Sequence, residues 1–192
     1  MKYKIWGKGI FDYSLAIILV IPFSVLIIVF GTLNFLSVGL PVFFNQPRVG
    51  RNGKIFKIYK LRTMVGTNIN SEFASSETHR ITQFGNFLRK TRIDELPQII
   101  NVLKGEMSFI GPRPEQPDFV KRYCEIIDDY NHRHFVKPGI TGLAQVENGY
   151  TDSDEGTKQK LKFDLLYIQK LDLKTDLKII YKTFFEVVRM TG

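Results

Sequence analysis

Thr91-Arg-Ile-Asp-Glu-Leu-Pro-Gln98 is the stretch around which we expect the chain to fold, because it sets two adjacent carboxylates among cations. Arg89 precedes it, and an apolar segment follows it as far as the rigid turn Gly111-Pro-Arg-Pro-Glu115. Carboxylates among cations have depressed pKa values, so we expect Asp94 and Glu95 to be ionised and able to bind a divalent metal or act as nucleophiles. The arginines suit a phosphate-bearing substrate. The simpler alternative is that the two acids only begin a helix, where the dipole favours negative charge.

The composition limits the classes of protein to which the chain can belong. Its 192 residues are enough for one domain with a hydrophobic core. The net charge of +8 indicates an acidic partner, such as nucleic acid, anionic lipid or a phosphorylated metabolite. The aromatic residues lie mainly in apolar runs and not in a basic strand pattern, so we expect no nucleic-acid partner. The single cysteine excludes an internal disulfide framework.

The N-terminal residues 1–40 have the pattern of a membrane anchor. Residues 15–30 carry no charge and reach roughly 24 Å as a helix, whereas a span needs about 30 Å. Pro22 lies in the middle of this run, where it kinks a helix. Lys and Arg flank the run on both sides, and cytoplasmic flanks favour these residues, so both ends prefer the same side of a membrane. We expect a re-entrant helix broken near Pro22; a full span and a buried soluble helix are the alternatives.

A β-hairpin is predicted after the anchor. Two short β-rich runs flank a turn at Asn52-Gly53, and Asn-Gly is a strong hairpin signal. On the second run, Lys60 and Arg62 share one face with apolar residues, and neither face is purely apolar. Lys60 or Arg62 reaches a phosphate in one interpretation, and in the other the hairpin is a solvated basic edge. Residues 65–80 are polar and form a predicted surface loop.

The rest of the chain is predicted to be mainly helical, which makes the fold class α+β with a large α part. Successive helical residues diverge by about 100°, so Asp94 and Glu95 are expected to have different roles. Residues 151–157 form an acidic loop, and the basic amphipathic tail after it packs on the core or lies on a membrane. The predicted helices run from about Thr82 to Lys90, Asp94 to Gly105, Pro117 to Tyr130 and Lys158 to Arg189.

Several phrases occur in order along nearly the whole chain and together resemble one family. They are Pro41-Val-Phe-Phe44, Gln46-Pro-Arg-Val-Gly50, Phe56-Lys-Ile-Tyr-Lys-Leu-Arg-Thr-Met64, Asp94-Glu-Leu-Pro-Gln98, Asn101-Val-Leu-Lys-Gly105, Met107-Ser-Phe-Ile-Gly-Pro-Arg-Pro114, Pro138-Gly-Ile-Thr-Gly-Leu-Ala-Gln-Val146 and Lys162-Phe-Asp-Leu-Leu-Tyr167. This set resembles the bacterial monotopic phosphoglycosyl transferases, the bacterial sugar transferase family.

The resemblance implies an activity and a location. Members of the family transfer a phospho-sugar from a UDP-sugar to polyprenol (undecaprenyl) phosphate and release UMP. They act on the cytoplasmic face of the bacterial inner membrane, where glycoconjugate assembly such as that of exopolysaccharide or lipopolysaccharide begins. The family's N-terminal segment is a re-entrant helix bent at a Ser-Pro pair, and residues 41–192 then form a catalytic domain with amphipathic interfacial helices. A homodimer is left open.

The resemblance also implies residue roles. Asp94 matches the family's nucleophile, which works with Mg²⁺, and Glu95 matches its partner carboxylate. The residues that become candidates for binding substrate or metal are Lys60, Arg89, Arg113 and Asp164, and Arg62 on the hairpin is a further substrate-binding candidate. An aspartyl-phosphate type of intermediate divides one transfer into two steps.

Three departures from the family pattern stand out. Ile21 precedes Pro22, so the Ser of the bend is absent. Glu147-Asn-Gly-Tyr150 follows the Ala-Gln-Val phrase where many small members have Asn-Gly-Arg, which removes a candidate phosphate-binding arginine and points to a different sugar or acceptor subgroup. Lys137 stands where an Arg is usual, which keeps the charge but not the bidentate geometry.

The alternative to a transferase is a protein without catalytic activity. Such a protein would be a membrane-bound module that binds lipid or acts as a scaffold.

Overall fold

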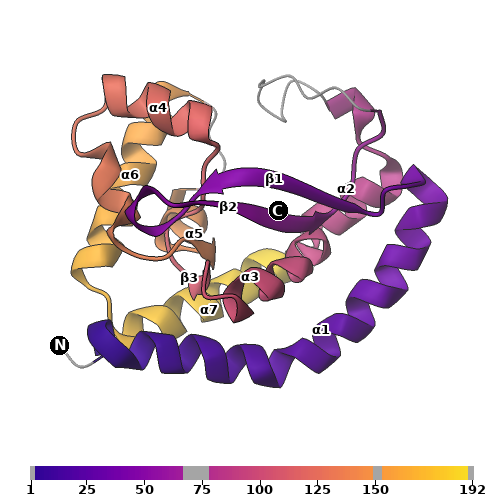
Figure 1. Ribbon diagram of the computed structural model, residues 1–192, viewed down its shortest axis with the longest axis horizontal. Helices are drawn as coiled ribbons and strands as arrows, with labels where there is room; N and C mark the ends of the chain where they lie inside the picture. The colour runs from indigo at the N-terminus through magenta and orange to yellow at the C-terminus, as the bar shows by residue number, and fades with distance from the viewer. Residues whose placement is uncertain (1–2, 67–77, 149–152, 190–192) are drawn as a thin grey trace.

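The computed structural model describes residues 3–66, 78–148 and 153–189, and it is mainly helical, as predicted (Figure 1). The helices are α1 (Lys8–Val38), α2 (Gln83–Lys90), α3 (Ile99–Leu103), α4 (Pro117–Ile126), α5 (Leu143–Asn148), α6 (Asp154–Gln169) and α7 (Leu173–Val188). The strands are β1 (Phe43–Val49), β2 (Ile55–Leu61), β3 (Ser108–Ile110) and β4 (Gly139–Thr141). Short helical turns are η1 (Tyr3–Gly7), η2 (Arg51–Gly53), η3 (Thr78–Arg80), η4 (Ile93–Gln98) and η5 (Tyr130–Phe135).

The N-terminal helix α1 is one continuous helix of 31 residues, and the expected break at Pro22 is not found. Figure 1 shows it curving along one side of the molecule, so the bend is spread over many residues. The Ser24 hydroxyl donates to the Val20 carbonyl at 2.7 Å, in the helical turn that contains Pro22. Only 11% of its most apolar window is buried, which does not fit a buried soluble helix. By length and composition, α1 is long and apolar enough to cross a membrane.

The predicted hairpin is confirmed. β1 and β2 pair antiparallel, from Phe43 opposite Leu61 to Val49 opposite Ile55. Asn52 adopts the left-handed φ of 55° that Asn tolerates in a tight turn. Burial then decides which face of β2 packs against the core: Phe56 and Ile58 are buried, whereas Ile55 is exposed. The alternation of residues along β2 did not predict this choice.

A second small sheet was not predicted. β3 and β4 pair in parallel, with Ser108 opposite Gly139. Gly111 lies just beyond β3, and its amide donates to the Thr141 carbonyl at 2.9 Å. A side chain on Gly139 would place its Cβ 2.1 Å from the Gly111 nitrogen, so the two backbones require glycine there. This close pairing fixes the start of the Pro-Arg-Pro turn.

The other predicted helices are found with changed limits. α2 agrees with the prediction, and Thr82 caps it by accepting from the Gly85 amide at 2.9 Å. The helix predicted from Asp94 is divided into η4 and α3, and the C-terminal tail into α6 and α7, with Leu171 buried between them. Ser153 caps α6, which therefore starts inside the predicted acidic loop. Residues 67–77 of the predicted surface loop, 149–150 of the departure at 147–150, and 151–152 of the acidic loop lie outside the described residues.

Candidate active site

Asp94 and Glu95 lie on η4, which begins abruptly. Arg92 precedes this turn with a left-handed φ of 58°, and the Glu95 amide donates to the Arg92 carbonyl at 3.1 Å. Pro97 is tolerated in so short a turn. The tight 3₁₀ winding sends successive side chains in different directions, and both carboxylates are buried, with 7% and 4% exposed.

Glu95 is held by cations from three elements. Lys60 Nζ on β2 lies 2.7 Å from Glu95 Oε1, and Arg113 Nη2 lies 2.9 Å from the same oxygen. Arg92 Nη1 is 3.9 Å away. Burial acts to raise the pKa of Glu95, but Arg113, Lys60 and Arg92 outweigh it and hold this pKa well below its usual range. Glu95 is therefore a fixed anion whose charge is already compensated.

Asp94 is different, and the expectation of a depressed pKa is wrong for it. Burial, followed by the charge of Glu95, raises its pKa to about 6 against the opposing effect of Lys60, Arg89 and Arg92. The Oδ1 atom of Asp94 is buried and has no hydrogen-bond partner within the described residues. An ionised oxygen that is buried, unpaired and next to a compensated carboxylate suits attack on a phosphorus or binding of a cation.

The Pro-Arg-Pro turn brings Arg113 to Glu95, and several bonds hold the turn from behind. Arg133 Nη2 on η5 donates to the main-chain carbonyl of Arg113 at 2.9 Å. Arg48 Nη1 on β1 donates to the Pro114 carbonyl at 3.2 Å. The Gly139 amide donates to the Pro112 carbonyl at 2.9 Å. Because its backbone is bonded on three sides, the turn fixes the direction of the Arg113 side chain.

Asp164, a predicted substrate or metal residue, supports this turn from α6. It is 2% exposed, and its Oδ2 lies 3.0 Å from Arg133 Nε and 2.8 Å from Nη2. Burial raises its pKa to about 6, although Arg133 opposes the shift. The carboxylate of Asp164 thus contacts the arginine behind the turn, and its path to Glu95 runs through Arg133 and Arg113.

Arg62, a predicted substrate-binding residue on the same strand face as Lys60, does not contact the carboxylate pair as Lys60 does. Its Nη2 donates to the Val38 carbonyl at the end of α1, and its own carbonyl accepts from Asn34 Nδ2 at 2.7 Å. Its contacts therefore join the hairpin to the C-terminal end of α1. Arg89, on α2, acts on Asp94 through its charge, which lowers the pKa of that carboxyl group.

Sequence reasoning missed Arg133. It lies between two histidines in Asn131-His-Arg-His134, within η5. His134 is buried, and burial, followed by the charge of Arg133, lowers its pKa to about 4, so it is neutral at pH 7. No signal in the sequence could have paired Arg133 with Asp164, 31 positions away.

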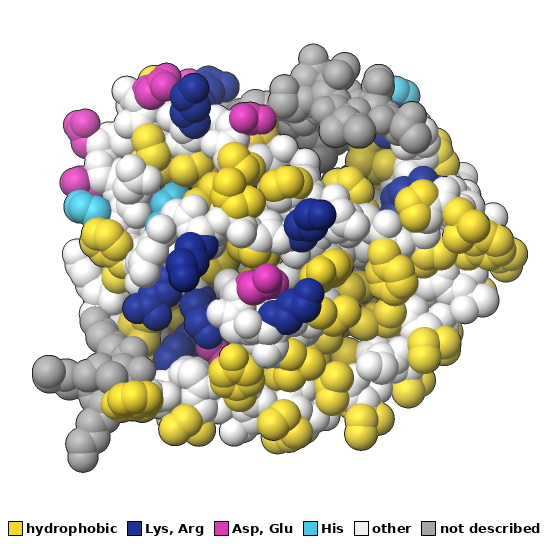
Figure 2. Space-filling model, in the orientation of Figure 1, with side chains coloured by type: hydrophobic (Ala, Val, Ile, Leu, Met, Phe, Trp, Pro, Cys, Tyr) yellow, Lys and Arg dark blue, Asp and Glu magenta, His cyan; other side chains and the backbone are white. Residues whose placement is uncertain are grey.

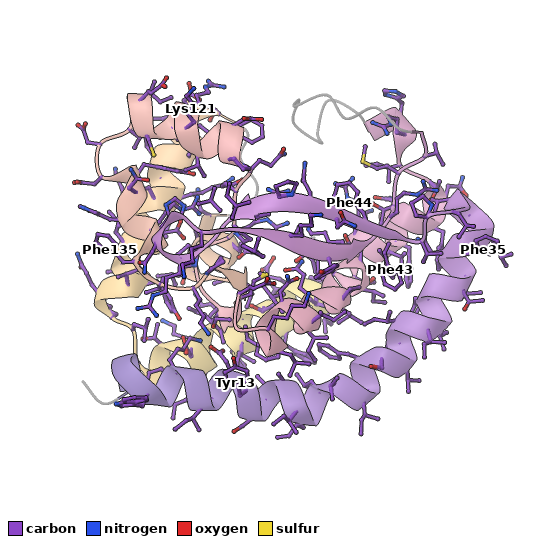
Figure 3. All side chains as sticks on the ribbon, viewed as in Figure 1. Tyr13, Phe35, Phe43, Phe44, Lys121 and Phe135 are labelled. Atoms are coloured by element: carbon purple, nitrogen blue, oxygen red, sulfur yellow. The ribbon has the colours of Figure 1, made fainter. Side chains whose placement is uncertain are left out.

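The surface around the site separates charge from apolar side chains. Figure 2 shows apolar side chains along the outer edge formed by α1, and Lys and Arg gathered on the face beside it. In Figure 3, Phe35 of α1 and Phe43 and Phe44 of β1 lie on the same side of the molecule. All three are exposed, at 44%, 48% and 41%. This side of the molecule therefore presents aromatic rings to its surroundings.

Comparison with known proteins gives the family. The family model described as bacterial sugar transferase matches residues 3–190. A UDP-N-acetylgalactosamine-undecaprenyl-phosphate N-acetylgalactosaminephosphotransferase of Aeromonas hydrophila is 44% identical over 181 residues, which are 93% of this chain and 43% of the relative. A UDP-glucose:undecaprenyl-phosphate glucose-1-phosphate transferase of Klebsiella pneumoniae is 42% identical over 177 residues, 90% of this chain and 37% of the relative.

A shorter relative is similar over nearly its full length. It is an uncharacterized sugar transferase of Bacillus subtilis, 40% identical over 185 residues, which are 96% of this chain and 89% of the relative. The chain spans less than half the length of the Aeromonas and Klebsiella relatives. The match of the family model over residues 3–190 nevertheless covers all elements described above. The chain therefore belongs to the bacterial sugar transferase family.

Proposed function

We propose that this protein transfers a sugar phosphate from a UDP-sugar to polyprenol phosphate, with undecaprenyl phosphate as the acceptor, and releases UMP. The Aeromonas and Klebsiella relatives transfer a sugar phosphate to undecaprenyl phosphate, according to their names. The observation that carries the proposal is Asp94 Oδ1, which is buried, has no hydrogen-bond partner in the described part of the chain, and lies beside a carboxylate that cations already compensate. The reaction is the first membrane step of glycan assembly.

The proposed transfer has two steps. An Asp94 oxygen attacks the phosphorus that carries the sugar, an O–P bond forms, and the bond from that phosphorus to the bridging oxygen breaks, so that UMP leaves. A phosphate oxygen of the acceptor then attacks the same phosphorus, the bond to Asp94 breaks, and the Asp94 carboxylate is restored. A covalent aspartyl-phosphosugar between the two steps predicts ping-pong kinetics.

The cations around Asp94 have a definite task in this proposal. An anionic carboxylate and an anionic diphosphate repel each other, and fixed positive charge must offset that repulsion. Lys60 and Arg113 compensate Glu95, so that Glu95 adds little to the repulsion. Arg89 and Arg92 supply further positive charge, since both lower the pKa of Asp94.

Mg²⁺ fits the donor set as part of the same proposal. The described residues contain no cluster of three or more His, Cys, Asp or Glu side chains that could hold a metal. Mg²⁺ is nevertheless often bound by one or two carboxylates with substrate phosphates and water as the other ligands, and the unpaired Asp94 Oδ1 offers one such oxygen. When bound, the ion supplies positive charge to the phosphate oxygens.

The membrane part of the proposal is a re-entrant α1 on the cytoplasmic face of the inner membrane. Near its N-terminal end, Asp12 of α1 bonds to Ser108, and near its C-terminal end, Asn34 bonds to the Arg62 carbonyl. Both ends therefore contact the catalytic domain, which supports the same side of the membrane for both. The curve of α1 and its exposed outer face support insertion of the middle (Figure 1).

Other surfaces support the same location at the membrane interface. α7 exposes Leu177, Tyr181 and Phe184 beside lysines of the same helix, which is the pattern of an interfacial amphipathic helix. A site at this level serves a water-soluble donor and a lipid acceptor together. A membrane-bound scaffold without activity has the same surfaces but does not need a buried carboxylate oxygen such as Asp94 Oδ1, for which the described residues supply no hydrogen-bond donor.

The test is a mass measurement on the membrane-extracted protein. With Mg²⁺ and the correct member of a UDP-sugar panel, and without acceptor, we expect a mass increase of one phospho-sugar on Asp94 and release of one equivalent of UMP. Addition of undecaprenyl phosphate then returns the protein to its original mass. A scaffold predicts lipid binding with no UMP release, and transfer by a protein that stays unmodified means direct displacement in a ternary complex.

A further inference from the structure

Strand β3 leads directly into the Pro-Arg-Pro turn, and α1 holds it on the side opposite β4. The Ser108 amide donates to the Pro138 carbonyl at 2.9 Å, on the side of β4. The next amide along a strand faces the other way, and the Phe109 amide donates to Asp12 Oδ1 of α1 at 3.2 Å. Asp12 therefore occupies the place that a further strand would take.

The same carboxylate oxygen holds a second group of β3. The Ser108 hydroxyl oxygen lies 2.9 Å from Asp12 Oδ1 and 2.8 Å from the Ile110 carbonyl oxygen. Asp12 is 3% exposed, and both Ser108 and Phe109 are buried. Without Asp12, the amide of Phe109 would stay buried and lose its hydrogen-bond acceptor, which is unfavourable. Loss of Asp12 would therefore favour a shift of β3 that gives this amide another acceptor.

Asp12 belongs to a polar cluster that seats the start of α1 in the core. Lys8 Nζ lies 3.3 Å from Asp12 Oδ1 and 2.9 Å from Asp176 Oδ2 on α7. The Tyr3 hydroxyl donates to Asp176 Oδ2 at 2.5 Å. Two residues connect this cluster to the backbone of β3: Asp12 accepts from the Phe109 amide, and Tyr167, which lies 2.9 Å from Asp176 Oδ1, donates to the Ile110 carbonyl at 3.1 Å. The bonds of Tyr3 and Lys8 to Asp176 hold the start of α1 against α7, and the bonds of Asp12 connect the same part of α1 to β3.

Arg113 follows β3 by three residues, so the position of the strand fixes where the turn begins. We infer that Asp12 is a positioning residue for the proposed transfer: through Ser108 and Phe109 it keeps β3 in register and thereby keeps the Arg113 guanidinium on Glu95. This inference rests on the proposed function, and it makes the seating of the membrane helix a condition for an assembled active site. Asp12 touches no reacting atom in this account.

Two substitutions at the same position separate the hydrogen bonds from the charge. Asp12→Asn retains an acceptor oxygen for β3 and loses the charge, whereas Asp12→Leu loses both. For Asp12→Leu we expect kcat to fall by about tenfold or more with the donor KM within about twofold, because a misplaced catalytic group slows the chemical step. Asp12→Asn should keep most of the wild-type kcat. Tyr3→Phe is the matched control: it removes one bond to Asp176 but leaves the bonds of Lys8 to Asp176 and of Asp12 to β3 in place, so kcat should stay close to that of the wild type.

A double-mutant cycle with Arg113→Met tests whether Asp12 acts through Arg113. Single-turnover formation of the covalent adduct is measured in the wild type, both single variants and the double variant. If the inference is correct, Asp12→Leu causes no further loss once Arg113 is replaced. Equal losses in both backgrounds overturn it, as does an Asp12→Leu protein with wild-type kcat. If Asp12→Leu does not fold, Ser108→Ala, which removes one of the two bonds, takes its place in the cycle. A wild-type protein with no transfer to any acceptor contradicts the proposed function instead.

Discussion

Lys60 Nζ lies 2.7 Å from Oε1 of Glu95, and this contact joins the hairpin to the carboxylate pair. Lys60 holds the pKa of Glu95 down and also lowers that of the adjacent Asp94. At Glu95 the cations outweigh burial and keep the side chain an anion, whereas at Asp94 burial and the charge of Glu95 outweigh the cations and raise the pKa to about 6. The two neighbouring carboxylates therefore have different charge behaviour, as their different roles require.

Asp94→Asn is expected to abolish transfer and to stabilise the fold. The folded-state pKa of Asp94, about 6, is above the ordinary aspartate pKa of 3.8, so the fold disfavours the ionised side chain and loses stability as pH rises from about 4 to 6. An amide removes this cost. We expect a higher Tm for the variant at pH 8, by about 2–4 °C for each kcal/mol recovered, and a shrinking difference as pH falls toward 4. Thermal unfolding of both proteins across this pH range measures it. A lower Tm at pH 8 contradicts the cost assigned to the ionised Asp94.

Lys60→Met is expected to move the pH dependence of adduct formation. Asp94 attacks when ionised, so the rate should rise with pH through a value near 6 in the wild type. Loss of Lys60 removes a charge that lowers the pKa of Asp94, so this limb should move to higher pH. Single-turnover rates from pH 5 to 9 measure the shift. Lys57→Met, which changes an exposed lysine of the same strand, is the control and should leave the limb in place; an unmoved limb in Lys60→Met contradicts the electrostatic role.

Arg133→Met is expected to destabilise the protein more than the double change Arg133→Met with Asp164→Leu. Arg133→Met alone leaves the Asp164 carboxylate buried without its partner, and Asp164→Leu alone leaves the Arg133 guanidinium so; either costs roughly 3–5 kcal/mol. The double change removes both charges of the buried pair. For a chain of this size such a loss lowers Tm by roughly 10 °C. Thermal unfolding of the single and double variants gives the comparison. If Asp164→Asn keeps the wild-type Tm and weakens only the Mg²⁺ dependence of transfer, Asp164 is a metal or substrate residue, as the resemblance implied.

The sequence was most informative where the signal was local. Asn52-Gly53 predicted the hairpin and Thr82 the start of α2, because a turn and a helix cap depend on a few adjacent residues. The parallel pair β3 and β4 was missed, since strands of three residues carry no periodicity and their pairing spans some thirty positions.

Within the site, the residue types could be predicted from the sequence, but the surroundings of each side chain could not. Lys60 on β2 and Arg62 just beyond its end occupy equivalent positions of the alternating pattern, yet Lys60 contacts Glu95 and Arg62 contacts the end of α1. The cations near Asp94 were visible in the sequence, whereas its burial was not, and burial is the larger effect on its pKa. Long-range packing decided both outcomes.

The side of the membrane on which each end of α1 lies can be tested with single cysteines. Cys124 is exposed, so it is first changed to Ser. Gly9→Cys places a probe in open space near the start of α1, and Lys54→Cys places one on the exposed hairpin turn. Because Asp12 and Asn34 bond the two ends of α1 to one catalytic domain, a re-entrant helix predicts that an impermeant maleimide labels both probes from the cytoplasmic side in inverted vesicles. Ile21→Cys, on the exposed middle of the helix, should be protected by lipid from either side. Labelling of the Gly9 probe only in right-side-out vesicles or cells would mean a full span, and the hydrogen bonds of Asp12 to β3 could not then coexist with that topology.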